Sequence, residues 1–310
     1  MADCLVTGGA GFIGSNLVRA LLERGKSVRV LDNFSTGRHD NVAEIKDDID
    51  LQVGDLRDPD ALFNACLGVQ AIFHFGALPS VARSVQDPLS THEVNVSGTL
   101  NLLLAAREAG VERFVLSSSS SVYGNTPVLP KQEDMRPEPL SPYALSKLAG
   151  EHYARIFTEL YGLKTFSLRY FNVFGPRQDP ASHYAAVIPL FINAFKQDQP
   201  PTIHGDGEQT RDFTFVDDVV AGNLCCLEAG DEAAGGVFNL AWGNRLSIKD
   251  LANQIGSLMN KEIAPVHEPS REGDVRDSQA DSSRARTLLN WEPRVELQEG
   301  LSRTIEWFMQ

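Results

Sequence analysis

The sequence predicts an α/β fold: a doubly wound parallel sheet followed by a smaller C-terminal α/β lobe. In the first half of the 310-residue chain, short apolar segments alternate with longer amphipathic ones, the pattern of strands that helices cover on both faces. A glycine-rich turn joins the first apolar segment to the first amphipathic one, and polar residues follow several of the later apolar segments. In open sheets of this kind, the residues that follow the strands line the ligand crevice.

The strands and helices of the sheet are predicted in alternation along the first half of the chain. Strands are expected where short runs are apolar and β-prone, and helices where apolar residues recur at helical spacing. The predicted strands are residues 4–7, 27–32, 50–55, 71–77 and 113–118. The predicted helices are residues 15–25, 59–66 and 91–110, the last of which ends at a glycine.

A long helix opens the second half of the chain, and both of its ends carry helix signals. Ser141 suits the N-cap, Pro142 suits the first turn, and Gly162 suits the end of the helix. A further strand is predicted over residues 164–175.

Beyond this strand the alternation loosens, and one more helix is marked clearly. Ser247 and Asp250 have the spacing of a capping box at the start of a helix over residues 247–259. There is no repeat and no long linker, so we expect two units with a cleft between them. The predicted units are a Rossmann-type domain over residues 1–171, with a returning segment at about 213–241, and a ligand-binding lobe over residues 172–212 and 242–310.

Composition narrows the class of protein. A formal net charge of −13 argues against a nucleic-acid binder and against attachment to anionic membranes, but not against binding of a nucleotide. No apolar run is long enough to span a bilayer, and the N-terminus lacks a signal-peptide pattern. The cysteines show no CxxC or zinc-ligand spacing, so we predict reduced thiols in a soluble cytoplasmic protein. They are Cys4, Cys66, Cys225 and Cys226.

The segment "TGGAGFIG" places Gly8, Gly11 and Gly14 between a strand and a helix. Such a turn presents backbone N–H groups to a pyrophosphate, although three glycines also suit a tight turn with no ligand. Asp32 ends the next strand, where an acid binds the ribose hydroxyls of NAD and repels the 2′-phosphate of NADP. A plain turn residue is the alternative for Asp32. Asp55 ends the third strand and is expected near the adenine ring.

Five consecutive serines, residues 117–121, follow the strand that begins at residue 113. At the end of a parallel strand they point into the ligand crevice. Tyr143 and Lys147 stand at i and i+4 on the long helix, so they share one face. We expect the lysine ammonium to lower the pKa of the tyrosine, so that the phenol can act as a base with a serine hydroxyl opposite. A surface pair on a helix is the alternative.

Together these motifs resemble the extended short-chain dehydrogenase/reductase family, and within it the nucleotide-sugar 4-epimerases. The resemblance covers essentially the whole chain. It rests on "TGGAGFIGSNL", "LDNFSTG", "GDLRD", "HFGAL", "NVSGTLNLL", "SSSSSVYG", "SPYALSK", "RYFNVFGPRQ", "GDGEQTRDFTFVDD" and "REGDVRDS".

The resemblance implies a role for each matched residue. It makes Ser119 the catalytic hydroxyl, with Ser118 as a neighbour that shares the role, Tyr143 the base, and Lys147 its partner, which also holds the nicotinamide ribose. The implied cofactor is NAD, with contacts from Gly8, Gly11, Phe12, Ile13, Gly14, Asp32, Asn33, Ser35, Asp55, Leu56, Phe75, Gly76, Ala77, Asn95, Tyr143, Lys147 and Tyr170.

The residues after the catalytic hydroxyl bear on the reaction. Related dehydratases and decarboxylases carry acidic residues there, whereas this chain has Ser120 and Ser121. The expected reaction is therefore a reversible 4-epimerisation, in which Tyr143 takes the proton of a sugar 4-hydroxyl while the C4 hydride moves to NAD. The ketosugar turns over and receives the hydride on its other face, so NAD stays bound.

The resemblance also implies a UDP-sugar site. Asn172 resembles a substrate contact, and Arg211 and Arg271 resemble the clamps of the diphosphate, with surface salt bridges as their alternative. His204 is expected near the uridine, or as a plain loop histidine. Further substrate contacts are predicted at Val187, Asp274 and Ser278.

One position bears on the sugar. Epimerases restricted to UDP-glucose and UDP-galactose have a bulky tyrosine where this chain has Ser278, and usually proline where it has Val173. The small serine favours UDP-GlcNAc and UDP-GalNAc. A UDP-glucose or a UDP-glucuronate 4-epimerase remains the alternative enzyme, and a non-catalytic NAD-binding sensor on the same fold is the alternative from another class.

Two expectations concern partners. In the family, two long helices, here near residues 93–109 and 142–160, form a four-helix bundle across a two-fold axis, so the resemblance implies a homodimer. The histidines are scattered without ligand spacing, so no metal is expected.

Overall fold

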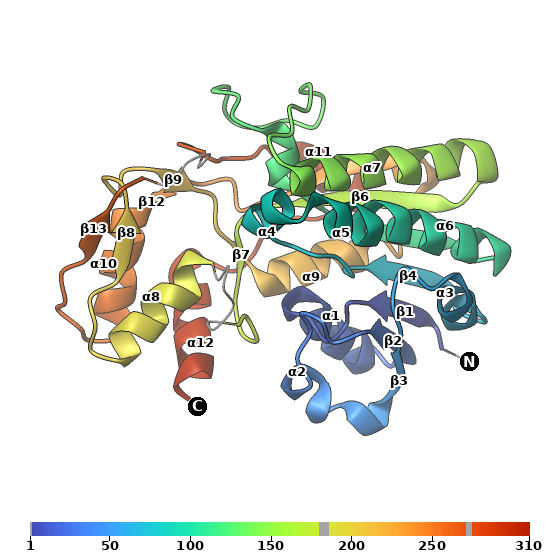
Figure 1. Cartoon of the computed structure of the whole chain (residues 1–310), viewed down its shortest axis with the longest axis horizontal. Coiled ribbons are helices and arrows are strands. Elements are labelled where there is room, and N and C mark those ends of the chain that lie inside the picture. Colours follow the sequence, from blue (N-terminus) through green and yellow to red (C-terminus); the bar gives the residue numbers. More distant parts are fainter. Residues whose placement is uncertain (1, 180–185, 271–274) are drawn as a thin grey trace.

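The computed structural model describes residues 2–179, 186–270 and 275–310. Within these ranges the main sheet has seven parallel strands in the order β11-β6-β5-β4-β1-β2-β3 (Figure 1). The chain runs outward from β1 through β2 to β3, then crosses to β4 on the other side of β1. This confirms the predicted doubly wound sheet, and a crevice is expected where the order reverses.

The main sheet consists of β1 (Cys4–Thr7), β2 (Val28–Asp32), β3 (Ile49–Val53), β4 (Ala71–His74), β5 (Arg113–Ser119), β6 (Lys164–Tyr170) and β11 (Gly236–Leu240). Shorter strands form separate pairs: β7 (Val173–Phe174) with β10 (Thr214–Phe215), β9 (Thr210–Arg211) with β12 (Leu246–Ser247), and β8 (Thr202–His204) with β13 (Val266–Glu268).

The α-helices are α1 (Phe12–Glu23), α2 (Asp40–Ala43), α3 (Pro59–Cys66), α4 (Val81–Gln86), α5 (Pro88–His92), α6 (Gly98–Glu108), α7 (Pro142–Tyr161), α8 (Val187–Lys196), α9 (Val216–Cys225), α10 (Ile248–Leu258), α11 (Ser283–Leu289) and α12 (Leu297–Met309). Short helical turns are η1 (Lys46–Asp48), the π-helical η2 (Glu93–Ser97), η3 (Ser120–Tyr123) and η4 (Asp231–Ala233).

Alternation along the strands divides the core into two layers. In β1, Val6 packs on one face of the sheet with Leu17 of α1, whereas Leu5 packs on the other face with Leu62 of α3 and Leu102 of α6. Figure 1 shows α6 and α7 on one side of the sheet and α1 and α9 on the other. Because both faces are covered, β1 and β4 at the centre are buried along their whole length, whereas the edge strand β3 leaves Asp50 and Val53 exposed.

Local signals at the ends of α3 and α7 are confirmed. The predicted helix at residues 59–66 is α3, and the Asp58 side chain accepts hydrogen bonds from the amides of its first turn. In α7, the Ser141 side chain accepts from the Ala144 amide at 3.1 Å, and Gly162 ends the helix in the left-handed conformation with φ of +73°.

The predicted helix over residues 91–110 differs from the observed one. The helical segment starts earlier, at Pro88, after Asp87 as N-cap, and it contains the π-helical turn η2 between α5 and α6. The π turn contains Asn95, whose side chain bonds backbone and side-chain groups outside the helix. Such turns are often found at functional sites, and hydrophobic spacing alone does not mark them.

The predicted strand over residues 164–175 is also interrupted. β6 ends at Tyr170 and belongs to the main sheet, whereas β7 pairs with β10. Asn172 lies between them with φ of +33°, outside the strand region. This residue redirects the chain away from the main sheet.

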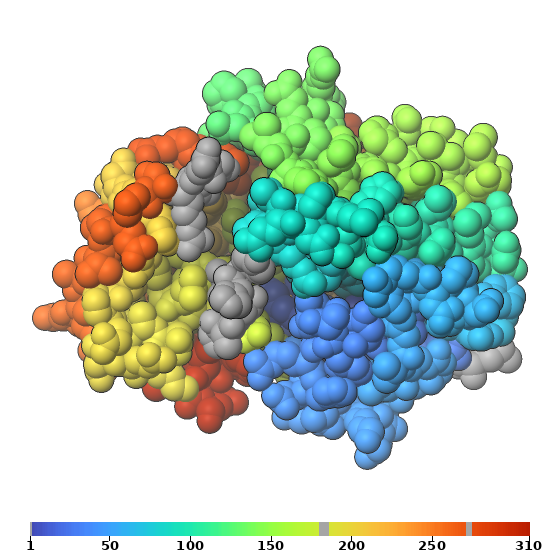
Figure 2. Space-filling view, viewed as in Figure 1, coloured from blue at the N-terminus to red at the C-terminus, as the bar shows by residue number. Residues whose placement is uncertain are grey.

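Elements that the sequence pattern left unassigned complete the structure. β11 pairs with β6 at the edge of the main sheet, so the segment around 213–241 returns to the first part of the chain. Figure 1 shows α8, α10, α12 and the strand pairs β8–β13 and β9–β12 on the left, beside the sheet, and Figure 2 shows the same part of the chain as a separate mass. Within the described ranges, no helix combines the length and apolarity needed to cross a membrane.

Candidate active site

The predicted cofactor residues follow the strands of the main sheet at one edge. Gly8 follows β1, Asp32 ends β2, Asp55 follows β3, Phe75 follows β4 and Ser119 ends β5. Because these strands are parallel, their carboxyl ends meet along the same edge. The structure therefore gathers the residues that the sequence selected from distant segments.

The turn after β1 is packed too closely for side chains. A Cβ at Gly8 would lie 2.7 Å from the Gly76 nitrogen, and Gly8 has φ of +69°. A Cβ at Gly14 would lie 2.3 Å from the Gly8 carbonyl oxygen. Both positions require glycine, so the turn is as tight as the sequence indicated, and its contact with a pyrophosphate stays a prediction.

Helix α1 begins directly after this turn, with Phe12 and Ile13 in its first turn. Its N-cap is Gly11, which offers no side chain, and no acidic residue lies in the first turn. The first amide N–H groups of a helix have no partner within it, and the helix dipole makes this end positive. This bare end, beside a turn without side chains, fits the pyrophosphate of a dinucleotide.

Asp32 is buried at the end of β2 and shapes the next loop. Its carboxylate accepts the Ala10 amide at 2.9 Å and the Phe34 amide at 2.8 Å. Burial raises the pKa of Asp32, and these two hydrogen bonds oppose the rise. Asn33 accepts the Ser35 amide at 3.0 Å in a local turn. Asp32 thus connects the glycine turn to the loop that follows β2.

Asp55 lies at the end of β3 with its carboxylate already paired. Arg57 donates to both oxygens at 2.9 Å, and Asn33 donates at 2.8 Å. The hydrogen bonds from Arg57 hold the pKa of Asp55 well below its usual range. Leu56, next in the chain, is buried, and a Cβ at Gly98 would lie 2.7 Å from its Cβ. The predicted adenine contact of Asp55 stays a prediction.

The serine run is an ordered end of β5. Ser118 is buried and donates its hydroxyl to Glu151 of α7 at 2.5 Å. Ser119 caps η3: its oxygen accepts the amide and the hydroxyl of Ser121, at 3.2 and 2.9 Å. Because successive side chains alternate, the structure separates Ser118 from Ser119.

Tyr143 lies in the first turn of α7, half-buried, with Ser119 as a neighbour. Burial raises the pKa of Tyr143, and the nearby Ser119 hydroxyl opposes the rise without cancelling it. The sequence-based expectation of a lowered tyrosine pKa is therefore wrong for the protein alone. The low-dielectric site disfavours the phenolate more strongly than the neighbouring groups favour it.

Lys147 is buried one turn further along α7. Its Nζ donates to the Ser117 carbonyl at 2.8 Å and lies 5.9 Å from the centre of the Tyr143 ring. Burial lowers the pKa of Lys147 to about 8, and the charge of Glu151 opposes this effect. Ser119, Tyr143 and Lys147 thus form one site, as the spacing of the sequence predicted.

Asn95 links two walls of this site. Its side chain accepts the Leu78 amide at 2.8 Å and donates to the Ser146 hydroxyl at 3.0 Å. Ser146 in turn donates to the carbonyl of Tyr143 at 2.7 Å. Asn95 therefore holds α7 against the segment after β4, which contains Gly76 and Ala77.

His74 was missed by the sequence reasoning. This residue is buried at the end of β4, with Nδ1 2.7 Å from the Thr7 hydroxyl and Nε2 2.9 Å from the Thr99 hydroxyl. Since Thr99 donates its hydroxyl to the Asn95 carbonyl, it accepts from His74. Burial, followed by the charge of Lys147, lowers the pKa of His74 to about 3, so the imidazole is neutral.

Glu151 and Arg169 were missed as well. They form a buried ion pair behind Lys147, with Nη2 2.7 Å from Oε2. The signals in the sequence were a glutamate at i+4 from Lys147 and a single arginine within an apolar strand. Tyr170, beside Arg169, is buried and donates its hydroxyl to Asn223 at 3.0 Å, with its ring stacked 6.4 Å from Phe75.

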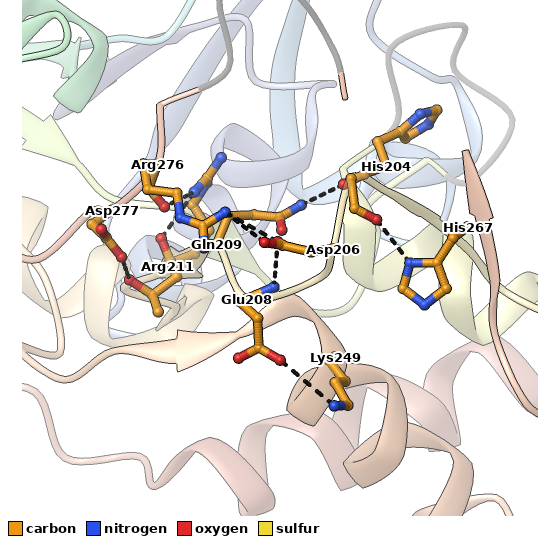
Figure 3. Close-up of polar contacts among 11 residues, drawn as sticks. His204, Asp206, Glu208, Gln209, Arg211, Lys249, His267, Arg276 and Asp277 are labelled. Atoms are coloured by element: carbon orange, nitrogen blue, oxygen red, sulfur yellow. Dashed lines mark hydrogen bonds and ion pairs between the residues drawn. The ribbon is translucent and has the colours of Figure 1, made fainter. Parts of the chain in front are cut away.

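A polar network lies between β8, β9 and the segment after residue 275 (Figure 3). Arg211 donates to the Thr210 carbonyl at 2.9 Å and to the Arg276 carbonyl at 3.3 Å. Gln209 donates to the His204 carbonyl at 2.7 Å, and the His204 ring lies 3.6 Å from Glu268. The structure thus places His204 close to the segment of residues 209–211, which contains Arg211.

Two other predicted substrate residues meet the same strand. The Ser278 amide donates to the Thr210 carbonyl at 3.1 Å, and the Asn172 side chain donates to the Asp212 carbonyl at 3.1 Å. Val187 is the first residue of α8, whose N-terminus carries no side-chain cap. Arg271 and Asp274 lie outside the described residues.

Searches of known proteins agree on one family. The model of the "NAD dependent epimerase/dehydratase family" matches residues 4–241. A UDP-glucose 4-epimerase of Mycolicibacterium smegmatis is 43% identical over 98% of this chain and 97% of its own length.

Solved structures agree as well. The UDP-N-acetylglucosamine 4-epimerase of Methanobrevibacter ruminantium, in complex with UDP-N-acetylmuramic acid, superposes with a TM-score of 0.94 at 38% identity, over 99% of this chain and 98% of that chain. The Thermus thermophilus UDP-glucose 4-epimerase complex with NAD has a TM-score of 0.90 at 36% identity, over 99% and 98% of the two chains. The glycine turn, the buried Asp32 and the Ser119–Tyr143–Lys147 site thus occur in a chain that belongs to the NAD dependent epimerase/dehydratase family.

Proposed function

We propose that this protein is an NAD-dependent UDP-sugar 4-epimerase that interconverts UDP-GlcNAc and UDP-GalNAc. The observation that carries the epimerase is the meeting of Ser119, Tyr143 and Lys147 at the end of β5. Ser119 lies beside Tyr143, and the Lys147 Nζ is 5.9 Å from the centre of the Tyr143 ring. Ser120 and Ser121, which begin η3, supply no acid for a dehydration. A reversible proton and hydride transfer needs only these residues for the proton and a bound NAD for the hydride.

The site residues would act together on the sugar 4-hydroxyl. Ser119 orients this hydroxyl, and Tyr143 takes its proton through or beside the Ser119 oxygen. NAD, when bound, accepts the hydride from C4 and returns it to the other face of the ketosugar. Because burial raises the pKa of Tyr143, the positive charge of Lys147 is needed to stabilise the phenolate.

The glycine turn, the bare N-terminus of α1 and Asp32 would hold the cofactor. The close backbone packing at Gly8 and Gly14 leaves room for a pyrophosphate against the amides of α1. Asp32 keeps lone pairs for the ribose hydroxyls while it accepts two amides. We assign cofactor binding to residues 1–171 with the segment around 213–241, and substrate binding to residues 172–212 and 242–310.

The N-acetylated substrate is supported by Ser278. This small residue is half-buried and bonded to the strand that carries Arg211, on the side where the UDP-sugar would lie. A tyrosine at this position would fill space that a 2-acetamido group needs. UDP-glucose and UDP-glucuronate are the alternative substrates.

The test is to incubate the purified protein with UDP-GlcNAc and, separately, with UDP-glucose, with NAD added only to parallel tubes. Proton NMR of the anomeric region follows the appearance of each 4-epimer. Faster turnover of UDP-GlcNAc would support the assignment, and turnover without added NAD would show a retained cofactor. Faster turnover of UDP-glucose would contradict the role of Ser278.

Two further parts of the proposal concern assembly and location. Leu89 of α5 and Leu145 and Leu160 of α7 are exposed on helices that lie at the surface in Figure 2, and they suit the two-fold helix bundle of a homodimer. Light scattering after size exclusion would detect the dimer. Cell fractionation would test the cytoplasmic location.

A further inference from the structure

A buried cluster of charges lies directly behind the proposed catalytic site. The side chains of Glu151 on α7 and Arg169 on β6 are each 3% exposed. The guanidinium of Arg169 donates two hydrogen bonds to this carboxylate, from Nε to Oε1 at 2.9 Å and from Nη2 to Oε2 at 2.7 Å. Ser118 adds a third hydrogen bond to Oε1 at 2.5 Å. Glu151 is thus fixed in position from three directions.

Helix α7 and strand β5 each bring the buried charges close to Lys147. Glu151 follows Lys147 by one turn on α7, so the two side chains share a face. On β5, Ser117 receives the Lys147 ammonium on its carbonyl, and the next residue, Ser118, holds Glu151. The lysine and the carboxylate are therefore held by neighbouring residues of β5 and stand one turn apart on α7.

Stability alone is a poor explanation for this ion pair. Taking two charges out of water costs about as much as their attraction returns, and apolar replacements of similar volume are often neutral or stabilising. Among the described residues, the Nη1 atom of Arg169 is buried without a hydrogen-bond partner. An incompletely satisfied buried pair next to a reacting group indicates a functional reason.

We propose that Glu151 is a positioning residue for the reaction: fixed by Arg169 and Ser118, its carboxylate stabilises the Lys147 ammonium that faces Tyr143. The role of Glu151 in turnover rests on the proposed function, whereas its effect on Lys147 does not.

The other groups around Lys147 do not supply this negative charge. His74 on β4 is neutral because burial and Lys147 lower its pKa. Tyr143 is a phenol with a raised pKa, and Tyr170 on β6 and Tyr123 on η3 are buried phenols whose pKa is also raised.

The remaining charged groups on packed elements are positive or lie nearer the surface. Arg169 carries a positive charge, since its hydrogen bond with Glu151 holds its pKa above the usual value against the effect of burial. Arg83 on α4 and Glu93 on η2 are half-buried, and His92 on α5 is exposed. Glu151 is the group whose charge keeps the pKa of Lys147 from falling further.

The experiment measures the ionisation of Lys147 directly. Protein with ¹³C-labelled lysine is titrated by NMR, and the Cε resonance of Lys147 is assigned by its loss in Lys147→Arg. The test variant is the double substitution Glu151→Gln with Arg169→Met, which removes both buried charges together and so leaves neither unpaired. Glu151→Asp keeps the charge with a shorter reach. Glu159→Gln, also on α7 but in an exposed pair with Arg155, is the matched control.

We expect the Lys147 midpoint near pH 8 in the native protein to fall by about one unit or more in the double variant. In Glu151→Asp, which keeps the charge, the midpoint should fall by less than in the double variant, and Glu159→Gln should leave the midpoint unchanged. At pH 8 a fall of one unit lowers the charged fraction, and with it the turnover, about fivefold. The alkaline limb of the kcat profile should move with the NMR midpoint.

An unchanged Lys147 midpoint in the folded double variant, or in Glu151→Gln alone if the double variant does not fold, would overturn the inference. So would a midpoint that falls while the alkaline limb of a measurable turnover stays in place. Failure of the proposed function has a different signature, because the native protein would then turn over no UDP-sugar while the midpoint still fell in the double variant.

Discussion

The substitution Gly14→Ala tests how the glycine turn holds the cofactor. The added Cβ would lie 2.3 Å from the Gly8 carbonyl oxygen and 2.9 Å from the Gly9 Cα. Both are backbone atoms, which cannot turn away as a side chain can. To reach a tolerated 3.0 Å the carbonyl must move by 3.0 − 2.3 = 0.7 Å, and to reach ordinary contact at 3.4 Å by 3.4 − 2.3 = 1.1 Å.

This displacement is large enough to break the contacts that the turn would make with NAD. The Gly8 carbonyl accepts the Gly11 amide at 3.0 Å, so the whole turn shifts with it. A hydrogen bond of about 2.9 Å from a turn amide to a phosphate oxygen would lengthen toward about 4 Å, beyond its useful range. One lost bond to a charged group costs about 1.5–3 kcal/mol, which corresponds to an NAD affinity about 10- to 150-fold weaker.

The assay is calorimetric titration of NAD into protein freed of cofactor, with circular dichroism to confirm the fold. Gly150→Ala is the matched control, because this glycine also lies in a helix, but the nearest atoms to its added Cβ are side-chain atoms, Leu116 Cδ2 at 3.2 Å and Thr99 Cγ2 at 3.8 Å. The control should bind NAD as the native protein does and should unfold at the same or a higher temperature. An affinity of Gly14→Ala within about threefold of the native value would refute the steric reasoning, since one lost bond costs at least about tenfold.

Three further substitutions test the site itself. Tyr143→Phe should lower kcat about 10²- to 10⁴-fold with NAD affinity retained, because the general base is lost while the glycine turn is intact; calorimetry and the NMR assay separate the two, and undiminished turnover would remove Tyr143 from the mechanism. Lys147→Met should abolish most turnover yet raise stability at pH 7, because burial lowers the pKa of Lys147 from 10.5 to about 8, a cost of about 3 kcal/mol to the charged form. That cost is present below pH 8 and is relieved as the pH rises from 8 to 10.5. Thermal unfolding should therefore show a smaller gain in stability of Lys147→Met over the native protein at pH 9.5 than at pH 7. A gain independent of pH would contradict the assignment. Ser278→Tyr should reduce turnover of UDP-GlcNAc at least about tenfold relative to UDP-glucose, as a group clashing in a pocket does, and equal losses on both substrates would show that Ser278 does not face the acetamido position.

The sequence by itself determined the features that depend on neighbours along the chain. The glycines of "TGGAGFIG" and the apolar strands predicted the doubly wound sheet, because a tight turn and a doubly covered strand each leave a local pattern. Ser141, Pro142 and Gly162 set the ends of α7, since caps act within one turn. The i, i+4 spacing placed Tyr143 and Lys147 on one face for the same reason.

Only the tertiary structure decided which of the serines faces the tyrosine. The run of identical residues gives no distinction between Ser118 and Ser119, and the choice follows from the register of β5 against β6 and α7. The same holds for the interruption at Asn172, whose positive φ serves the pairing of β7 with β10. Pairing partners far apart in the chain leave no local signature.

Electrostatics depended most on the tertiary structure. Spacing predicted a lysine beside a tyrosine and hence a lowered phenol pKa, whereas the folded site raises it because burial outweighs the neighbouring groups. The effect of Lys147 on the pKa of His74 joins α7 to β4, and the pairing of Arg169 with Glu151 joins β6 to α7, so both exist only once these elements pack. A pKa is set by all charges and by the solvent around a group in space, and the order of residues along the chain specifies neither until the fold has formed.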